Sequence, residues 1–292
     1  MNQPLAVQLP IRVEALIQAL SVHFSRAGLF YGHGTESAWD EAVYLVLSVT
    51  GLADDQSVLQ RDVPAAALAR IADIADARIR TRSPLAYLLG ACQYAGLTFE
   101  VSPAVLVPRS PIGLWLLEQG DAYLERSPGT IVDLCTGCGC LGIVAALAYP
   151  QAQLLLSDID PAALKVARRN VVRHGLQERT WIVQADAVAG FAARQAFDLV
   201  LCNPPYVNAA DMASLPVEYR REPAHALAAG ADGLEIIVPI IERLPELLSP
   251  KGLFVGEVGH SAPALGRRFS DLPLAWLESE AGAQGVFAIR AT

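Results

Sequence analysis

Short apolar runs alternate with helix-like segments from residue 130 onward, and this alternation limits the possible folds more than any other feature. Predicted strands cover residues 130–134, 153–157, 181–185, 197–202 and 253–258. Predicted helices cover residues 140–148, 161–175 and 234–248, and another follows Ser261. Parallel strands joined through helices form right-handed crossovers, with helices on both faces of the sheet. The sequence therefore predicts a doubly wound α/β sheet, closed by an antiparallel pair at residues 274–277 and 286–290.

The first ninety residues show helical spacing instead. Apolar residues with this spacing include Val13, Leu16, Ile17 and Leu20, and later Ala42, Leu45, Val46 and Val49. Ser37 and Asp62 are predicted N-caps, because their side-chain oxygens can accept hydrogen bonds from the free N–H groups of a first turn. His33 stands between two glycines and is expected to be a solvated loop residue. This region is therefore predicted to be a small helical bundle.

Residues 85–112 are predicted to bridge two domains. Residues 94–101 alternate with period two around a glycine turn, which is typical of a hairpin. Residues 105–112 are extended because Pro108 and Pro111 restrict the backbone. The predicted organisation is a helical domain over residues 1–84, this bridge, and an α/β domain over residues 113–292. The helical domain contains no cofactor motif and is expected to recognise the substrate.

Composition narrows the class of protein. The chain has 292 residues, 53% of them hydrophobic and 18% charged, which indicates a well-buried globular protein. No apolar run reaches the roughly 18 residues of a membrane helix, and Met1-Asn2-Gln3-Pro4 does not resemble a signal peptide. Five cysteines in apolar or Gly-rich segments favour reduced thiols and a cytoplasmic location. The net charge of −8 disfavours tight duplex binding and suits a basic protein partner.

One predicted strand ends in an unusual group of side chains. The apolar run at residues 197–202 is followed at once by Asn203-Pro204-Pro205-Tyr206. Proline cannot donate to a sheet ladder, so the strand stops at the carboxyl edge, where open α/β sheets bind ligands. The Asn203 side chain can pair with another amide or with an exocyclic amine, and Tyr206 can stack on a planar group. The motif therefore predicts a site that holds a planar NH2 group.

A glycine-rich loop follows the first strand of the α/β domain. Gly137, Gly139 and Gly142 fit G-x-G-x-x-G, and Asp158 lies 21 residues after Gly137, which formally matches a dinucleotide-binding fingerprint. Asp133 argues against a dinucleotide, because its carboxylate would face a pyrophosphate and no arginine near the glycines would offset it. A carboxylate there suits the cationic amino-acid end or the sulfonium of S-adenosylmethionine (AdoMet).

Three aspartates, Asp133, Asp158 and Asp186, stand at the ends of three successive predicted strands. Asp158 can accept hydrogen bonds from both ribose hydroxyls of AdoMet, and Asp186 can accept one from its adenine amine. Gly137 and Gly139 would let the backbone approach the methionine and the ribose. The alternative is that the aspartates only cap the helices that follow them. Their recurrence at three strand ends favours the cofactor site.

The cysteines of the same loop raise the question of a metal. Cys135 and Cys138 have the spacing of half a zinc site, and Cys140 follows closely. A structural zinc site needs four ligands, usually from two such pairs, and the sequence contains no second pair. Small residues packed beneath a cofactor loop are the favoured interpretation, and no metal is expected.

With these motifs in place, the chain resembles the protein-glutamine N5-methyltransferases of the HemK-like group over nearly its whole length. Three further segments carry the resemblance: Arg80-x-Arg82-x-Pro84-x-x-Tyr87-Leu88-x-Gly90, Gly96-Leu97-x-Phe99, and Glu222-Pro223-x-x-Ala226-Leu227-x-x-Gly230-x-Asp232-Gly233-Leu234. The resemblance implies a seven-stranded, Rossmann-like AdoMet-dependent methyltransferase domain with a helical N-terminal substrate domain.

Two segments favour one branch of this group. They are Val107-Pro108-Arg109-Ser110-Pro111-Ile112-Gly113 and Asp211-Met212-x-x-Leu215-Pro216-x-Glu218-Tyr219-Arg220. Both resemble the branch that methylates the third protein of the large ribosomal subunit, whereas release-factor enzymes typically carry Pro-Arg-Pro-Asp-Thr-Glu in the bridge. Cys138 departs from the Ser or Thr that is usual in the family, at a position where only a backbone contact is expected.

The resemblance implies methylation of a glutamine side-chain nitrogen, with S-adenosyl-L-homocysteine as the spent cofactor. Asn203 and Pro204 would each accept one N–H of the substrate amide, Pro205 would shape the turn, and Tyr206 would pack on the amide. A release-factor glutamine methyltransferase is the nearest alternative. An adenine N6-methyltransferase is disfavoured by the acidic charge, and a non-catalytic AdoMet-binding assembly factor is disfavoured by the intact Asn203–Tyr206 motif.

Overall fold

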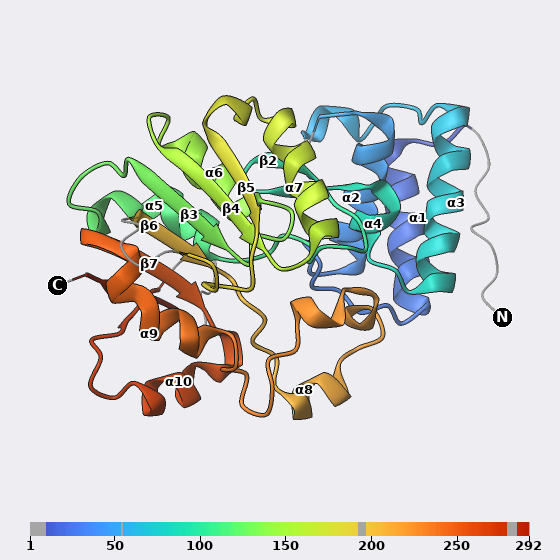
Figure 1. Cartoon of the computed structure of the whole chain (residues 1–292). Helices are drawn as coiled ribbons and strands as arrows, with labels where there is room; N and C mark the ends of the chain where they lie inside the picture. The colour runs from blue at the N-terminus through green and yellow to red at the C-terminus, as the bar shows by residue number, and fades with distance from the viewer. Residues whose placement is uncertain (1–9, 54, 192–196, 279–284, 292) are drawn as a thin grey trace. The chain divides into compact units, whose positions relative to one another are not determined.

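The computed structural model describes residues 10–53, 55–191, 197–278 and 285–291, and the chain divides into two compact units (Figure 1). The helical unit comprises Met1–Cys92 together with Pro216–Arg221. The α/β unit comprises Gln93–Leu215 and Glu222–Thr292. The first boundary falls inside the predicted bridge. The chain returns to the helical unit at Pro216–Arg221, which was not predicted. We call these six residues the return segment.

The helical unit contains α1 (Val13–Arg26), α2 (Ala38–Thr50), α3 (Ala65–Thr81) and α4 (Leu85–Leu89). Buried apolar side chains on the predicted faces form its core, among them Leu16, Leu20, Leu45 and Ile71. Ser37 is the N-cap of α2, and its side chain accepts a hydrogen bond from Asp40 N, as predicted. The prediction for Asp62 was wrong: Pro64 is the N-cap of α3, and Asp62 pairs with Arg12 in an isolated β-bridge.

The return segment completes the core of the helical unit with a buried carboxylate. Glu218 is 2% exposed and accepts hydrogen bonds from Phe30 N at 3.1 Å and Arg82 Nη1 at 2.8 Å. Its Oε1 also lies 3.7 Å from Nη1 of Arg78, which is 1% exposed. The next residue, Tyr219, packs on His33 with ring centroids 4.4 Å apart. His33 is therefore buried, and the expectation of a solvated loop residue was wrong.

The α/β unit is built on a seven-stranded sheet in the part of the chain that the structure describes. Its strands are β3 (Thr130–Leu134), β4 (Gln153–Asp158), β5 (Thr180–Gln184), β6 (Phe197–Cys202), β7 (Leu248–Glu257), β8 (Ala275–Trp276) and β9 (Val286–Arg290). Their spatial order is β5-β4-β3-β6-β7-β9-β8, with β9 antiparallel to both of its neighbours. The predicted doubly wound sheet and its closing antiparallel pair are confirmed. The strand order reverses between β3 and β6, which is where such sheets bind ligands.

The helices of this unit are α5 (Ile112–Tyr123), α6 (Cys140–Ala148), α7 (Pro161–Arg173), α8 (Ala209–Ser214), α9 (Ile237–Leu247) and α10 (Ala262–Arg268). The α6 backbone packs so closely on the sheet that a Cβ at Gly142 would lie 2.4 Å from Leu156. On the opposite face Val132 and Phe254 share a core with α9 and α10, orange to red in Figure 1. Helix α8 was not predicted within the loop after Tyr206. None of the described helices combines the length and apolarity needed to cross a membrane.

Two shorter pieces precede α5. Strands β1 (Ala91–Tyr94) and β2 (Leu97–Glu100) form the predicted hairpin, and the chain passes from the helical unit to the α/β unit inside β1. The extended residues that follow are attached to the α/β unit through Tyr94, whose hydroxyl donates to Ser110 O at 2.6 Å and accepts from Gly113 N at 3.0 Å. The predicted proline-rich segment therefore belongs to the α/β unit.

Candidate active site

A cavity of about 320 Å³ opens within the α/β unit at the carboxyl ends of β3 to β6. Each of the four strands contributes residues that directly follow it or end it: Cys135–Cys138 after β3, Asp158 and Ile159 at β4, Ala185–Ala187 after β5, and Asn203 and Pro205 after β6. The remaining walls come from residues 104–106 and 108–110, from the loop around His225, from residues of α6 and α7, and from Glu235 and Ile236. The sheet edge thus gathers most of the predicted site residues in one place.

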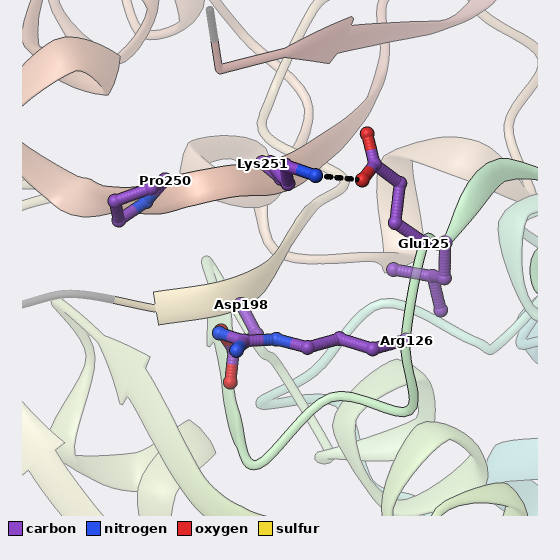
Figure 2. Close-up of a pocket in the computed structure, with 6 residues that line it drawn as sticks. Glu125, Arg126, Asp198, Pro250 and Lys251 are labelled. Carbon is purple, nitrogen blue, oxygen red and sulfur yellow. Dashed lines mark hydrogen bonds and ion pairs between the residues drawn. The ribbon is translucent and has the colours of Figure 1, made fainter.

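A second hollow, of about 420 Å³, lies at the opposite edge of the sheet. Figure 2 shows the residues that line it, and the four charged ones form two ion pairs. Lys251 Nζ lies 2.6 Å from Glu125 Oε2, and Arg126 Nη2 lies 2.9 Å from Asp198 Oδ1. Asp198 also accepts from Gly129 N and from Ser249 Oγ, so it ties neighbouring segments together. The charges here satisfy one another, which indicates a structural role.

Three residues with left-handed backbone conformation, two of them glycines, shape the glycine loop. Gly137 has φ +57° and Gly139 has φ +87°, a region that side-chain-bearing residues rarely adopt. Gly137 lines the cavity, whereas Gly139 is the N-cap of α6 and lies against Leu156. Cys135 also has a positive φ, +54°. Such strain in a residue with a side chain is typical of functional sites, and it turns the chain sharply from β3 into the loop.

Asp158 links the second strand end to this loop. Its Oδ2 accepts from Gly137 N at 2.8 Å, and its Oδ1 accepts from Asp160 N at 2.9 Å. Burial raises the pKa of Asp158, while these two backbone hydrogen bonds lower it. The carboxylate lines the cavity, and each oxygen retains a lone pair for a ligand. The helix-cap alternative belongs instead to Asp160, whose side chain accepts from Ala162 N at the start of α7.

Asp133 lies behind the loop and is not among the residues that line the cavity in the described chain. It is 1% exposed, and its Oδ2 accepts from Gly142 N and from the hydroxyl of Thr136, which does line the cavity. Its Oδ1 is buried and has no hydrogen-bond partner among the described residues. Burial raises the pKa of Asp133 to about 7. The side chain is thus both a support for the loop and an unfilled acceptor.

The third strand end contributes an exposed carboxylate. Asp186 follows β5 and lines the cavity, together with Ala185 and Ala187. Ile159, the residue after Asp158, is 54% exposed although it is large and apolar, and it lines the same cavity. Carboxylates and an apolar side chain therefore stand side by side around this end, an arrangement that suits a ligand with polar edges and a flat apolar face.

The Asn203–Tyr206 motif divides between the cavity and its support. Asn203 lines the cavity, and its Oδ1 is buried without a hydrogen-bond partner among the residues that the structure describes. A buried acceptor left unfilled is costly, and native sites that keep one usually have a ligand for it. Pro205 also lines the cavity, and Pro204 is buried. The Tyr206 hydroxyl donates to Glu257 Oε1 at 2.8 Å, so its polar end faces the sheet and not the cavity.

Several residues that support the site were not predicted. Glu222 is 4% exposed and accepts from Val107 N at 2.9 Å and from both terminal nitrogens of Arg109 at 2.7 Å. This bidentate pair joins the bridge residues that wall the cavity to the loop after Tyr206. Glu257, at the end of β7, is the other unpredicted residue. Its sequence signal was the same as for the aspartates, a carboxylate that ends an apolar strand.

The cysteines show no metal geometry. Within the described residues no group of three or more His, Cys, Asp and Glu side chains could hold a metal ion. Cys138 is buried, and its carbonyl accepts from the Asn170 side chain at 2.9 Å. Cys202 is buried beside Cys135. Burial is the main cause that raises the pKa of the Cys202 thiol, and the neighbouring Cys135 raises it further. All five cysteines are free thiols, and four of them, Cys92, Cys138, Cys140 and Cys202, are buried.

Methyltransferases are among the known proteins that this chain resembles in fold and in sequence. The family model of the methyltransferase small domain matches residues 116–230. The crystal structure of the hMettl16 catalytic domain, in complex with the MAT2A 3'UTR hairpin 1, is similar with a TM-score of 0.52. That likeness covers 75% of this chain and 78% of that one at 16% identity, and it concerns the fold alone.

Two curated relatives cover almost the whole chain. The ribosomal protein uL3 glutamine methyltransferase of Bordetella pertussis is 43% identical over 269 residues, 90% of each protein. The enzyme of the same name from Burkholderia pseudomallei is 38% identical over 290 residues, 96% of this chain and 94% of the relative. A match over 96% of the chain includes residues of both units. The chain belongs to the family of the ribosomal protein uL3 glutamine methyltransferases.

Proposed function

We propose that this protein transfers a methyl group from AdoMet to the side-chain nitrogen of a glutamine in ribosomal protein uL3. The observation that carries the proposal is the buried, unpartnered Oδ1 of Asn203 at the cavity wall. A primary amide of the substrate has an N–H of the right polarity for this acceptor. Family membership supports the same conclusion, because the relatives are named for this substrate.

The chemistry requires orientation more than a strong base. The nitrogen of a primary amide is a weak nucleophile, because its lone pair is delocalised into the carbonyl. An acceptor that holds one N–H fixes the direction of that lone pair and stabilises the positive charge that develops on nitrogen. We assign this role to Asn203 Oδ1, with the Pro204 carbonyl as the second acceptor. Pro204 and Pro205 restrict the backbone, so both acceptors are rigid.

The cavity residues fit AdoMet. Asp158 would accept ribose hydroxyls, Asp186 would accept the adenine amine, and Ile159 would cover the ring. The unfilled Oδ1 of Asp133, behind the loop, suits the positively charged methionine end, acting alongside Thr136. Gly137 leaves the loop backbone open, whereas Gly139 lets the loop pack against Leu156. Bound AdoMet supplies an electrophilic sulfonium methyl group. The protein contributes binding, orientation and the exclusion of water.

Replacing Asp158 by alanine is expected to weaken AdoMet binding by about 1–3 kcal/mol, because an acceptor for the ribose is lost. The substitution also frees Gly137 N, so the loop loses one of its supports. Isothermal titration calorimetry with AdoMet measures the effect. Asp160→Ala is the matched control, because it removes an N-cap two residues away, outside the cavity lining, and should keep the affinity within about threefold. Equal affinities for both variants would contradict the assignment.

AdoMet affinity is expected to fall by up to about tenfold for each pH unit below 7, because Asp133 must be ionised to hold a cation. Burial raises the pKa of Asp133 from 3.8 to about 7 in the folded protein. The unfolded chain ionises near 3.8, so this group contributes stability at low pH that is lost as the pH rises toward 7. Calorimetry between pH 5.5 and 8 tests the prediction. Asp133→Asn should lose this pH dependence, and a variant that keeps it would show that another group is responsible.

The helical unit is proposed to recognise the ribosomal protein. It contributes none of the residues that line the cavity in the described chain. The net charge of −8 suits a basic partner, and the proposed location is the cytoplasm. Deletion of residues 1–92 alone is not a suitable test, because Glu218 in the return segment would lose its partners Phe30 and Arg82. We expect a variant with substituted exposed residues on α1 and α3 to keep its AdoMet affinity and lose transfer to intact uL3.

The decisive test offers uL3, a release factor and DNA side by side with labelled AdoMet. Label is expected in a glutamine of uL3, identified by mass spectrometry of the digested protein. Label in the release factor alone would support glutamine methylation but show that the substrate is the release factor and not uL3. Label in adenine alone would overturn the proposal, and so would AdoMet binding without transfer to any acceptor, which is the behaviour of an assembly factor.

A further inference from the structure

Glu257 is a buried carboxylate with both oxygens committed to other parts of the site. It is the last residue of β7 and is 5% exposed. Its Oε1 accepts from the Tyr206 hydroxyl at 2.8 Å, and its Oε2 accepts from Ser110 Oγ at 2.5 Å. One side chain therefore joins the end of the amide motif to the bridge segment that walls the cavity.

The Tyr206 ring and backbone are held from further sides. Ser261 Oγ donates toward Tyr206 O and toward Asp232 O, both at 3.1 Å. A Cβ added at Gly259, where φ is +45°, would lie 2.7 Å from the Tyr206 ring. A Cβ at Gly233, where φ is +79°, would lie 2.3 Å from Tyr206 O. The backbone of Gly259 therefore lies against the Tyr206 ring and that of Gly233 against its carbonyl, and Glu257 lies at the polar end of the ring. We call these surroundings of Tyr206 the cradle.

This cradle bears directly on the amide acceptors. Tyr206 follows Pro204 and Pro205, whose rings leave few free torsions between it and Asn203. A shift of the Tyr206 ring would therefore be transmitted to the Asn203 side chain at the cavity wall. Burial raises the pKa of the Glu257 carboxyl, whereas the hydrogen bonds from Ser110 and Tyr206 and the positive charge of Arg109 lower it.

We propose that Glu257 is a positioning residue for methyl transfer, which holds Tyr206 through its hydroxyl and thereby fixes the amide-binding turn at Asn203. The inference rests on the proposed function, since it concerns the same acceptors. Glu257 touches neither substrate nor cofactor in this scheme. Its effect should appear in turnover and in the use of the substrate amide, while AdoMet binding stays as it is.

A double-mutant cycle tests the proposal on the full-length protein. The variants are Glu257→Gln, Tyr206→Phe and their combination, with Glu246→Gln on α9 as a matched control at an exposed position. Glu257→Gln keeps the shape of the side chain, and calorimetry with AdoMet verifies that each variant is folded and binds the cofactor. Initial rates with labelled AdoMet give kcat and KM for the uL3 substrate separately.

Glu257→Gln is expected to lower kcat about tenfold to hundredfold, as small misplacements of reacting groups do. Tyr206→Phe should give a similar loss, and the double variant should be no more than about twofold worse than the poorer single variant, because one hydrogen bond carries both effects. Ser110→Ala, which removes the Oε2 partner and the weaker acceptor of Ile112 N at 3.3 Å but leaves the Tyr206 bond intact, should lose less than Glu257→Gln. The AdoMet Kd should stay within about threefold throughout.

An unchanged kcat for Glu257→Gln would overturn the proposal, and so would losses in the two single variants that add fully in the double variant. A fall in AdoMet affinity that matches the loss of rate would also overturn it, because it would indicate general damage. If the unsubstituted protein labels only DNA, the proposed function fails by that result alone. The same cycle run on the DNA acceptor then still decides the role of Glu257.

Discussion

Replacement of Asn203 by alanine is expected to lower the rate of methyl transfer about 10²–10³-fold, the usual effect of removing one preorganised hydrogen bond from a transition state. The variant leaves a substrate N–H without its acceptor in a closed site, and the nitrogen lone pair loses its fixed direction. AdoMet affinity should change much less, because Asp158, Asp186 and the glycine loop remain. Initial rates with labelled AdoMet and calorimetry of cofactor binding separate the two effects.

Two further variants sharpen this measurement. Asn203→Asp keeps an acceptor oxygen and should retain part of the activity. Asn208→Ala removes another asparagine from the same loop, one whose side chain caps α8 by accepting from Asp211 N at 2.9 Å. Asn208 is outside the cavity lining, so its loss should change the rate by less than about threefold. A rate for Asn203→Ala within fivefold of the unsubstituted enzyme would exclude the proposed acceptor role.

Replacement of Glu218 by alanine is expected to destabilise the helical unit by about 3–5 kcal/mol, as breaking a buried ion pair usually does. Glu218 is 2% exposed and serves Phe30 N, Arg82 and Arg78 at once. Without it Arg78, itself 1% exposed, keeps Glu41 at 2.6 Å as its one carboxylate partner within the described part of the chain. The guanidinium would then be buried with too little compensating charge.

Hydrogen exchange followed by mass spectrometry localises this effect. Protection should fall in α1, α2 and α3 and stay unchanged in β3, β6 and β7. Glu242→Ala is the matched control, because Glu242 is exposed and its nearest cation, Arg268, is 3.9 Å away. Such exposed pairs contribute about 0–1 kcal/mol. Unchanged protection in the three helices of Glu218→Ala would show that the return segment is not part of their cooperative unit.

The sheet could be predicted well from the sequence because its signals are local. Strand β3 and helix α6 have their predicted bounds. Strand β6 ends at Cys202, directly before Asn203 and the two prolines that follow it, as predicted. The carboxylates at the strand ends were found because a parallel sheet brings those ends to one edge. Prediction therefore succeeded where hydrophobic periodicity and backbone restriction determine the structure within about ten residues.

The remainder depends on contacts between distant residues. Glu218 lies 140 positions after Arg78 along the chain, and nothing in its neighbourhood distinguishes it from a solvated residue. His33 was expected in solvent for the same reason, since its cover is Tyr219. Asp133 was expected to face a ligand, but the structure turns one of its oxygens to Gly142 N. The direction of a side chain at a strand end depends on the helix that packs there. Short-range sequence patterns therefore do not predict this direction.

The return segment has a consequence for how the chain folds on the ribosome. Helix α4 ends at Leu89, so helices α1 to α4 are synthesised more than a hundred residues before Glu218. At 5–20 residues per second this interval is on the order of ten seconds. Throughout it, Arg78 has Glu41 but not Glu218, and His33 has no cover from Tyr219. The first part of this protein to be synthesised is therefore among the last to reach its final stability.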